Sequence, residues 1–161
     1  MQYYGRSYTA TVTGQGGASG VGLIEVYDLD GSGASRLANI STRGLVASSV
    51  NVLIGGFILG GGSANTKVLV RAIGPSLANA GIANPLSNPT LEVRDGNGAL
   101  LFGNDNWEDR QQSAIEQTGI PPNDSLESAV VADLGPGAYT AIVAGKGDST
   151  GVALIEVYNL R

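Results

Sequence analysis

The chain has 161 residues and a formal net charge of −5, from 14 Asp and Glu against 9 Lys and Arg. This length suits one β-sandwich or two very small domains. A folded chain of this size buries roughly two-thirds of the surface that the unfolded chain exposes. No basic cluster could follow a phosphate backbone, so nucleic acid is not an expected partner. The longest apolar stretch, 50–60, is broken by glycine and is far shorter than the about 20 residues of a membrane helix, so membrane insertion is not expected.

Glycine is unusually frequent: 25 of the 161 residues are glycine, about twice the usual share of ~7%. Each glycine inside a helix costs ~1 kcal/mol relative to alanine, whereas tight turns between short strands accept glycine readily. The composition therefore favours an all-β protein. The absence of cysteine suits a protein exposed to changing redox conditions. Residues 1–6 do not have the pattern of a signal peptide, so an exported protein would be a mature or excised form.

The first predicted element, residues 8–30, is repeated at residues 139–161. The two segments read YTATVTGQGGASGVGLIEVYDLD and YTAIVAGKGDSTGVALIEVYNLR, and they align without gaps at an offset of 131 with 14 of 23 positions identical. Each copy contains a strand of period two, a glycine-rich loop and a second strand that is apolar on both faces. We interpret each copy as a β-hairpin.

The offset allows two domain organisations. In the first, residues 1–30 are an N-terminal hairpin that belongs to a preceding unit or acts as a donor to another subunit, and residues 31–161 form one β-sandwich unit. In the second, the repeat is a duplication inside one sandwich, with the two hairpins at opposite edges. The sequence leaves both open. Residues 31–35, GSGAS, are expected to be a flexible connector.

The pattern between the two copies remains β-type. A single helical turn is predicted at 74–81, and Asp-Gly-Asn-Gly at 95–98 predicts a tight turn between two strands. A short helix is predicted near 107–118, with Asn106 as its cap. The predicted strands are 51–59, 67–73, 90–94, 99–102 and 129–134. Together these elements predict an antiparallel β-sandwich, jelly-roll-like, with one short helix and an extra N-terminal hairpin.

Two segments resemble the pre-peptidase C-terminal (PPC-like) β-sandwich domains of secreted bacterial proteins. They are NPTLEVRDGNGALLFGNDNW at 88–107 and ESAVVADLGPGAYTAIVAGKGDSTGVALIEVYNL at 127–160. The segment 35–77, SRLANISTRG…VLVRAIGPSL, is also similar to a repeat found in tandem in large bacterial surface proteins. The resemblance implies an extracellular or cell-surface accessory module without catalytic residues. One departure is that no catalytic domain accompanies the module in this sequence.

The residue types give little support to an enzyme. The chain has no His and no Cys, which are the commonest general base and the thiol nucleophile. Calcium is the only cofactor that the sequence suggests, because Asp95, Asn97, Asn104 and Asp105 place oxygen ligands on two loops. In the alternative interpretation, these residues form the turn and cap the helix.

Charged residues within apolar sequence predict buried ion pairs. Arg36, Arg43 and Arg71 stand near apolar stretches, and Glu25 and Glu156 occupy otherwise apolar strands. A buried charge requires a partner. We therefore expect these arginines to pair with these glutamates, above all Arg71 with Glu25 or Glu156.

These features predict a non-enzymatic, extracellular structural module that associates with itself, in a filament or a surface coat. The N-terminal hairpin would add strands to an open sheet edge of a neighbouring copy, in a head-to-tail arrangement. The alternative is a monomeric sandwich that binds carbohydrate or another matrix polymer, with surface polysaccharide as its partner. The residues expected at the interface between copies are Tyr3, Tyr4, Tyr8, Val12, Val21, Leu23, Ile24, Val26 and Tyr27.

Overall fold

The computed structural model describes residues 7–27, 38–48, 50–60 and 63–160. The chain divides into two units, Met1–Arg36 and Leu37–Arg161. The boundary that we predicted between residues 30 and 31, and the connector at 31–35, lie outside the described residues.

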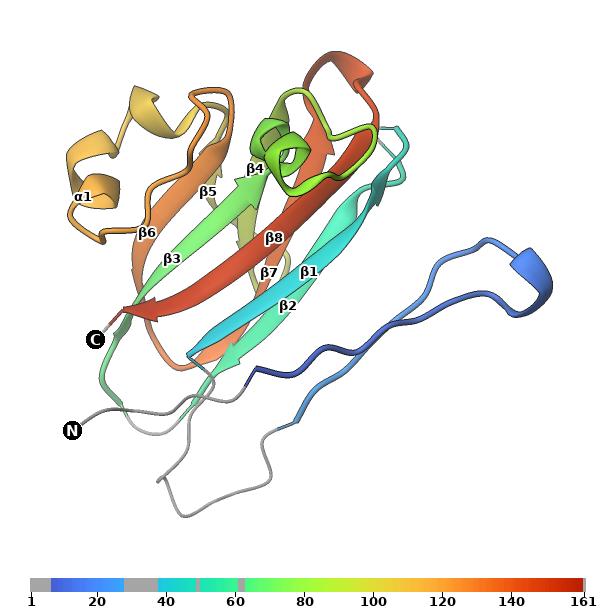
Figure 1. The fold of residues 1–161 in the computed structure, drawn as a ribbon. Helices are drawn as coiled ribbons and strands as arrows, with labels where there is room; N and C mark the ends of the chain where they lie inside the picture. Colours follow the sequence, from blue (N-terminus) through green and yellow to red (C-terminus); the bar gives the residue numbers. More distant parts are fainter. Residues whose placement is uncertain (1–6, 28–37, 49, 61–62, 161) are drawn as a thin grey trace. The chain divides into compact units, whose positions relative to one another are not determined.

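The second unit contains eight strands in two antiparallel sheets (Figure 1). The strands are β1 (Asn39–Val46), β2 (Leu53–Leu59), β3 (Thr66–Ile73), β4 (Pro89–Asp95), β5 (Leu100–Asn104), β6 (Ser128–Leu134), β7 (Gly137–Gly145) and β8 (Gly151–Leu160). The strand order is β1-β8-β3-β6 in one sheet and β2-β7-β4-β5 in the other. This is the arrangement of an eight-stranded jelly roll. The predicted fold class is therefore confirmed.

Helical structure in the second unit is confined to short segments. These are the 3₁₀ segments η2 (Pro75–Ala80), η3 (Trp107–Asp109) and η4 (Lys146–Asp148) and the α-helix α1 (Gln112–Glu116). The predicted turn at 74–81 is present as η2, and Gly81 ends it with φ 74°. The helix predicted near 107–118 is divided into η3 and α1. Trp107 and Ile115 on these segments are buried in a second cluster with Leu69 of β3 and with Ala129 and Val131 of β6. Figure 1 shows α1 beside β6.

The main core lies between the two sheets. Alternate residues of each strand face inward, as the period of a β-strand requires. The core is built from β-branched and aliphatic side chains such as Val70, Leu91, Val143 and Ile155, all at most 1% exposed. Phe57 in this core stacks on the partly buried Tyr139, with ring centroids 5.5 Å apart. The core is therefore continuous through both sheets.

The interpretation of residues 139–161 as a hairpin is wrong. β7 and β8 lie in different sheets, where β7 pairs with β2 and β4 and β8 pairs with β1 and β3. Both strands are central in their sheets, so each has its two ladder partners in neighbouring strands. We call residues 137–160 the C-terminal arch, because its two strands face one another across the core.

β1 is a strand that the sequence pattern did not predict. It is an edge strand that pairs only with β8, and polar residues such as Asn39, Ser41 and Arg43 occupy its outward positions. Thr42 faces inward and is nevertheless exposed, because no strand covers that side of the sandwich. A strand covered on one side only does not need the apolar pattern of a central strand.

The first unit is described at residues 7–27, which we call the N-terminal arch. Two extended segments run from the 3₁₀ turn η1 (Gln15–Gly17) (Figure 1). No strand is assigned within residues 7–27. Every residue from Tyr8 to Tyr27 is exposed.

Candidate functional site

The N-terminal arch carries the inward-facing residues of a sandwich core on an exposed segment. In the C-terminal arch these positions are buried and are occupied by Val143, Ile155 and Val157. The equivalent residues at an offset of 131 are identical: Val12, Ile24 and Val26. Ile24 is 47% exposed, whereas Ile155 is 1% exposed. The same apolar surface is therefore covered in one copy and uncovered in the other.

The two arches also share the geometry of their turns. Gly16 and Gly147 are equivalent and have φ 66° and 61°, a conformation that glycine adopts without strain. A Cβ atom at Gly14 would lie 1.8 Å from the carbonyl oxygen of residue 18, and one at Gly145 would lie 1.9 Å from that of Ser149. Each turn thus requires glycine at the same place. The N-terminal arch therefore has the turn geometry of the C-terminal arch, although no strand is assigned within residues 7–27.

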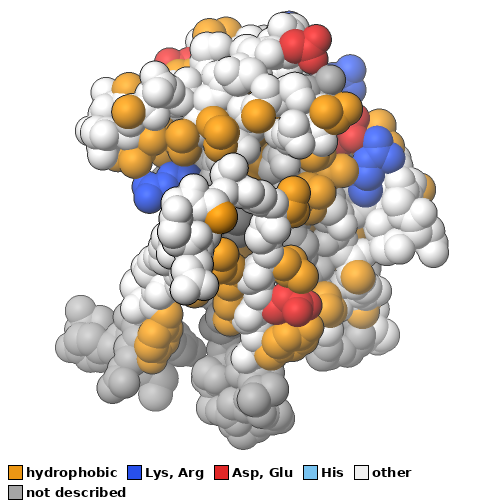
Figure 2. Space-filling model, turned by 90° about the vertical axis from the view of Figure 1, so that its right-hand side faces the viewer, with side chains coloured by type: hydrophobic (Ala, Val, Ile, Leu, Met, Phe, Trp, Pro, Cys, Tyr) orange, Lys and Arg blue, Asp and Glu red, His pale blue; other side chains and the backbone are white. Residues whose placement is uncertain are grey.

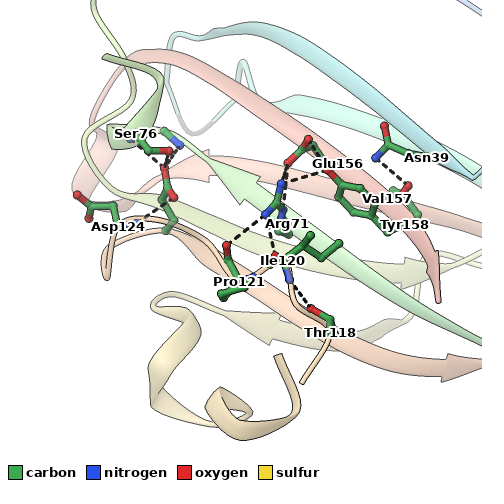
Figure 3. Close-up of polar contacts among 12 residues, drawn as sticks. Asn39, Arg71, Ser76, Thr118, Ile120, Pro121, Asp124, Glu156, Val157 and Tyr158 are labelled. Carbon is green, nitrogen blue, oxygen red and sulfur yellow. Dashed lines mark hydrogen bonds and ion pairs between the residues drawn. The ribbon is translucent and has the colours of Figure 1, made fainter. Parts of the chain in front are cut away.

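Arg71, Glu156 and Tyr158 form a half-buried polar network on the outer face of the β3–β8 ladder (Figure 3). Arg71 Nε donates to Glu156 Oε2 at 3.0 Å, and Arg71 Nη2 contacts the same carboxylate. Arg71 Nη1 donates to the carbonyl oxygen of Ile120 at 2.8 Å. The Tyr158 hydroxyl donates to Glu156 Oε1 at 2.9 Å, and the guanidinium carbon of Arg71 lies 5.1 Å from the Tyr158 ring centroid. Glu156 is thus one of the two glutamates that we predicted for Arg71.

The network changes the acidity of Tyr158. Burial and the hydrogen bond to Glu156 raise the pKa of Tyr158 above its ordinary value of 10.0, and the nearby Arg71 charge opposes the shift. The side chains of Arg71 and Glu156 are only 14% and 13% exposed. The pair therefore ties β3 to β8 and binds the loop before β6 through the Ile120 contact.

Half of this network is repeated in the N-terminal arch. Glu25 and Tyr27 are the equivalents of Glu156 and Tyr158, and the Tyr27 hydroxyl donates to Glu25 Oε1 at 3.0 Å. This bond, together with the negative charge of Glu25, raises the pKa of Tyr27. Both residues are exposed, and within the described residues no arginine pairs with Glu25. The arch has the glutamate–tyrosine pair and lacks the arginine that completes it in the sandwich.

The edge formed by β1 and β2 is a second uncovered surface. β2, like β1, pairs on one side only, in its case with β7. Leu45 on β1 and Ile54 and Ile58 on β2 are between 56% and 76% exposed, and Val50 in the connection between the strands is also exposed. Figure 2 shows many hydrophobic and few charged side chains on the side of the molecule that it displays. Unpaired edges of this kind readily accept a further strand.

The remaining predicted interface residues fall into two groups. Tyr3 and Tyr4 lie outside the described residues. The others are exposed on the N-terminal arch: Tyr8, Val12, Val21, Leu23, Ile24, Val26 and Tyr27. Their role at an interface stays a prediction.

The structure does not bring the four predicted calcium ligands together. Asp95 and Asn97 lie at the β4–β5 turn, where Asp95 Oδ1 accepts hydrogen bonds from the backbone N–H groups of Asn97 and Ala99. Asn104 lies at the other end of β5, opposite Leu91. Within the described residues there is no group of three or more His, Cys, Asp or Glu side chains that could hold a metal ion.

Asp105, the fourth predicted ligand, lies in a different environment. Its Oδ2 contacts Lys146 Nζ, and its Oδ1 is buried without a hydrogen-bond partner among the described residues. Asn88, Asn106 and Ser149 contain further buried oxygens of this kind. Calcium binding stays a prediction, and Asp105 is the one of the four ligands with an available buried oxygen.

Glu127 is a buried functional group that sequence reasoning missed. Its side chain is 0% exposed. Glu127 Oε1 accepts hydrogen bonds from Gly74 N–H, Ser76 N–H and the Ser76 hydroxyl, and Oε2 accepts one from Asp124 N–H (Figure 3). The carboxylate thus binds the turn at η2 to the loop before β6. Its donors Gly74 and Ser76, at the start of η2, are 53 and 51 residues away along the chain, so no local motif identifies the site.

No protein-family model matches the chain, and a search of curated proteins finds no significant similarity. Among the residues that the structure describes, no helix has the length and apolar character needed to cross a membrane.

Proposed function

We propose that this chain is a non-enzymatic, extracellular structural module that associates with itself head to tail through its N-terminal arch. The observation that carries the proposal is the pair of arches: the chain contains two copies of one sequence segment, and only the C-terminal copy forms strands of the sandwich within the described residues. The exposed copy retains the core-facing valines and isoleucine of the buried copy. Exposed apolar side chains grouped in this way typically mark a surface for association.

The C-terminal arch already occupies the centre of both sheets, so strand addition at an edge is favoured over strand replacement. A replacement of β7 and β8 by the arch of a neighbour would bury one arch and expose another of similar sequence, so the two changes would largely offset one another. Addition to an unpaired edge buries the N-terminal arch without displacing anything. The arch and the accepting edge are different surfaces, so the contact is heterologous and produces a ring or an open filament.

The binding-module alternative has less support from the described side chains. A platform for carbohydrate would need exposed aromatic rings on the sandwich. Trp107 is buried and donates from Nε1 to the carbonyl oxygen of Asp124, and Tyr139 lies in the core with its hydroxyl bonded to the carbonyl oxygen of Gly135. The PPC-like resemblance agrees with an accessory module at the cell surface, which is the localisation that we propose.

The proposal is tested by comparing the full chain with a chain of residues 37–161 by analytical ultracentrifugation and electron microscopy. We expect the full chain to form larger species as its concentration rises and the shortened chain to remain a folded monomer. Monomeric full-length protein at every concentration would refute self-association. Equal assembly of both chains would show that the N-terminal arch is not the connector.

A further inference from the structure

The direction of the backbone groups in β1 defines what its free edge can accept. Asn159 N–H donates to the carbonyl oxygen of Ala38 at 3.1 Å, so the backbone of residue 38 faces β8. In an antiparallel ladder the direction alternates with each residue. Residues 40, 42, 44 and 46 therefore also face β8. The residues whose N–H and C=O groups face the free edge are Asn39, Ser41, Arg43 and Leu45.

The same alternation defines the side of an arch strand that meets such an edge. In β8, Val152 bonds through its backbone to Asn84 and Leu86, away from β1. Glu156 and Tyr158 lie an even number of residues after Val152, so their backbone groups also point away from β1. They face β3, where Glu156 lies opposite Arg71. The equivalents of these β3-facing residues in the N-terminal arch are Val21, Leu23, Glu25 and Tyr27.

β1 repeats the features of β3 that receive β8. Both strands run antiparallel to β8. Arg43 is followed two residues later by Leu45, as Arg71 is followed by Ile73. All four residues have outward-facing side chains, and in β3 Arg71 belongs to the edge that β8 covers. In β1 the corresponding edge is free, Arg43 is exposed, and Arg43 has no ion-pair partner within the part of the chain that the structure describes.

From this correspondence we infer that residues 21–27 of one copy pair antiparallel with the free edge of β1 in a second copy, with Glu25 opposite Arg43. This inference rests on the proposed function and names its acceptor site. The register places Tyr27 opposite Ser41 and Leu23 opposite Leu45. It reproduces the β8–β3 register, in which Tyr158 lies opposite Leu69 and Leu154 lies opposite Ile73. A cross-strand pair of opposite charges stabilises such a ladder.

The other half of the N-terminal arch then adds to the second sheet. β1 and β2 are neighbouring edges of the sandwich, as β8 and β7 are neighbouring central strands. Residues 8–13 are equivalent to part of β7 and meet the free edge of β2. Both sheets become five-stranded, and the added arch covers the open side of the core at Thr42 and Leu53. We assign this edge to a second copy because the proposed function joins copies head to tail.

Charge reversal tests the pairing in the full chain. The variants are Glu25→Arg and Arg43→Glu, and the controls with the same charge changes on exposed residues of the α1 region are Glu116→Arg and Arg110→Glu. We expect each test variant to weaken association on the order of tenfold, because like charges then lie opposite one another. We expect the controls to associate like the unchanged chain.

Mixing the two test variants distinguishes a second copy from the same chain. In an equimolar mixture, each contact between unlike variants restores opposite charges. The arginine introduced at position 25 of one variant meets the glutamate introduced at position 43 of the other, and the unchanged Glu25 meets the unchanged Arg43. We therefore expect association to return to the unchanged level.

The outcomes of these experiments separate the inference from the proposed function. The mixture could fail to restore association, while a chain that carries both changes restores the contact and remains a monomer. This result would place the contact within one molecule and overturn the inference. Association of the unchanged chain without any effect of either variant would reject the β1 edge and leave the proposed function standing. A monomeric unchanged chain would reject both.

Discussion

At the residue scale, Glu127 holds together segments that the strand ladders do not connect. Its buried carboxylate accepts four hydrogen bonds from Gly74, Ser76 and Asp124. Donors left without an acceptor in a buried site cost about 1–3 kcal/mol each before relaxation. The residue is therefore a structural anchor for η2 and the loop before β6.

We predict that Glu127→Ala lowers the free energy of unfolding by about 3–4 kcal/mol, because it leaves several buried donors unpaired. Glu127→Gln should cost about 1–2 kcal/mol, because one amide oxygen can still accept the bonds made to Oε1. Urea denaturation of both variants measures these changes. Glu108→Gln, at an exposed position, is the control and should stay within about 0.5 kcal/mol of the unchanged chain.

The raised pKa of Tyr158 predicts a stability that depends on alkaline pH. The unfolded chain loses this phenol proton first as the pH rises, because the folded-state pKa lies above the ordinary value of 10.0. The contribution of this pKa shift to the free energy of unfolding is complete below that value, and it is lost as the pH rises through the folded-state pKa. Denaturation curves at about pH 9 and about pH 11 should show a smaller loss for Tyr158→Phe than for the unchanged chain. An identical loss in both would contradict the assignment.

Tyr27→Phe is the matched control for this pH effect. The pKa of Tyr27 is also raised, by its hydrogen bond to Glu25 and by the charge of Glu25. Tyr27 is exposed in the N-terminal arch, so its titration should leave the unfolding of residues 37–161 unchanged. Absorbance titration should still detect the loss of one phenol.

At the element scale, equivalent residues of the two arches should affect different properties of the protein. Ile155→Ala removes a core side chain that is 1% exposed and should lower the free energy of unfolding by about 2–4 kcal/mol. Ile24→Ala changes the equivalent residue in the exposed arch and should leave the unfolding of the monomer within about 0.5 kcal/mol, while it weakens association. Chemical denaturation and sedimentation of the two variants measure both effects. A large loss of monomer stability in Ile24→Ala would place the N-terminal arch in its own core.

Proline substitution tests the free edge of β1 without use of charge. Arg43 directs its N–H to the free edge, so Arg43→Pro removes no ladder hydrogen bond and should keep stability within about 1 kcal/mol. It should nevertheless weaken association, since an incoming strand loses a donor. Thr42→Pro removes an N–H that faces β8 and should destabilise the sandwich by ~3 kcal/mol. Unchanged association of Arg43→Pro would argue against strand addition at β1.

The sequence pattern was sufficient for the strands that have a strong β signature. β3, β6 and β8 are rich in β-branched residues, and the glycine and proline positions located the turns at 74–81 and 95–98. β1 was missed because its outward residues are polar, which suits an edge strand as well as a loop. Alternation of residues also cannot distinguish a hairpin from an arch, because both give strands of period two. That distinction depends on which strands supply the ladders.

The candidate site was likewise predictable from the sequence only in part. The repeat identified the N-terminal arch and its apolar residues directly. The pairing of Arg71 with Glu156 followed from the presence of charges on apolar strands, although the register that brings them opposite is set by the whole sheet. Glu127 could not be predicted, since its partners on η2 are distant in the chain and most of its partners are backbone groups.

At the scale of the whole molecule, the chain contains two arches and one sandwich. The sandwich contains its own C-terminal arch, and the N-terminal arch repeats the sequence of these two central strands. Addition of this arch to the β1–β2 edge of another copy would extend both sheets through the contact. Because each copy has one N-terminal arch and one free β1–β2 edge, repetition of the contact gives a linear or closed assembly.

The most direct test of this account is amide hydrogen exchange of residues 21–27 at low and high protein concentration. We predict rapid exchange at low concentration, where the arch is exposed, and protection at high concentration, where alternate N–H groups enter a ladder with β1 of another copy. Rapid exchange of these amides at every concentration would contradict the account. Protection that does not depend on concentration would also contradict it, because the arch would then be covered by its own chain.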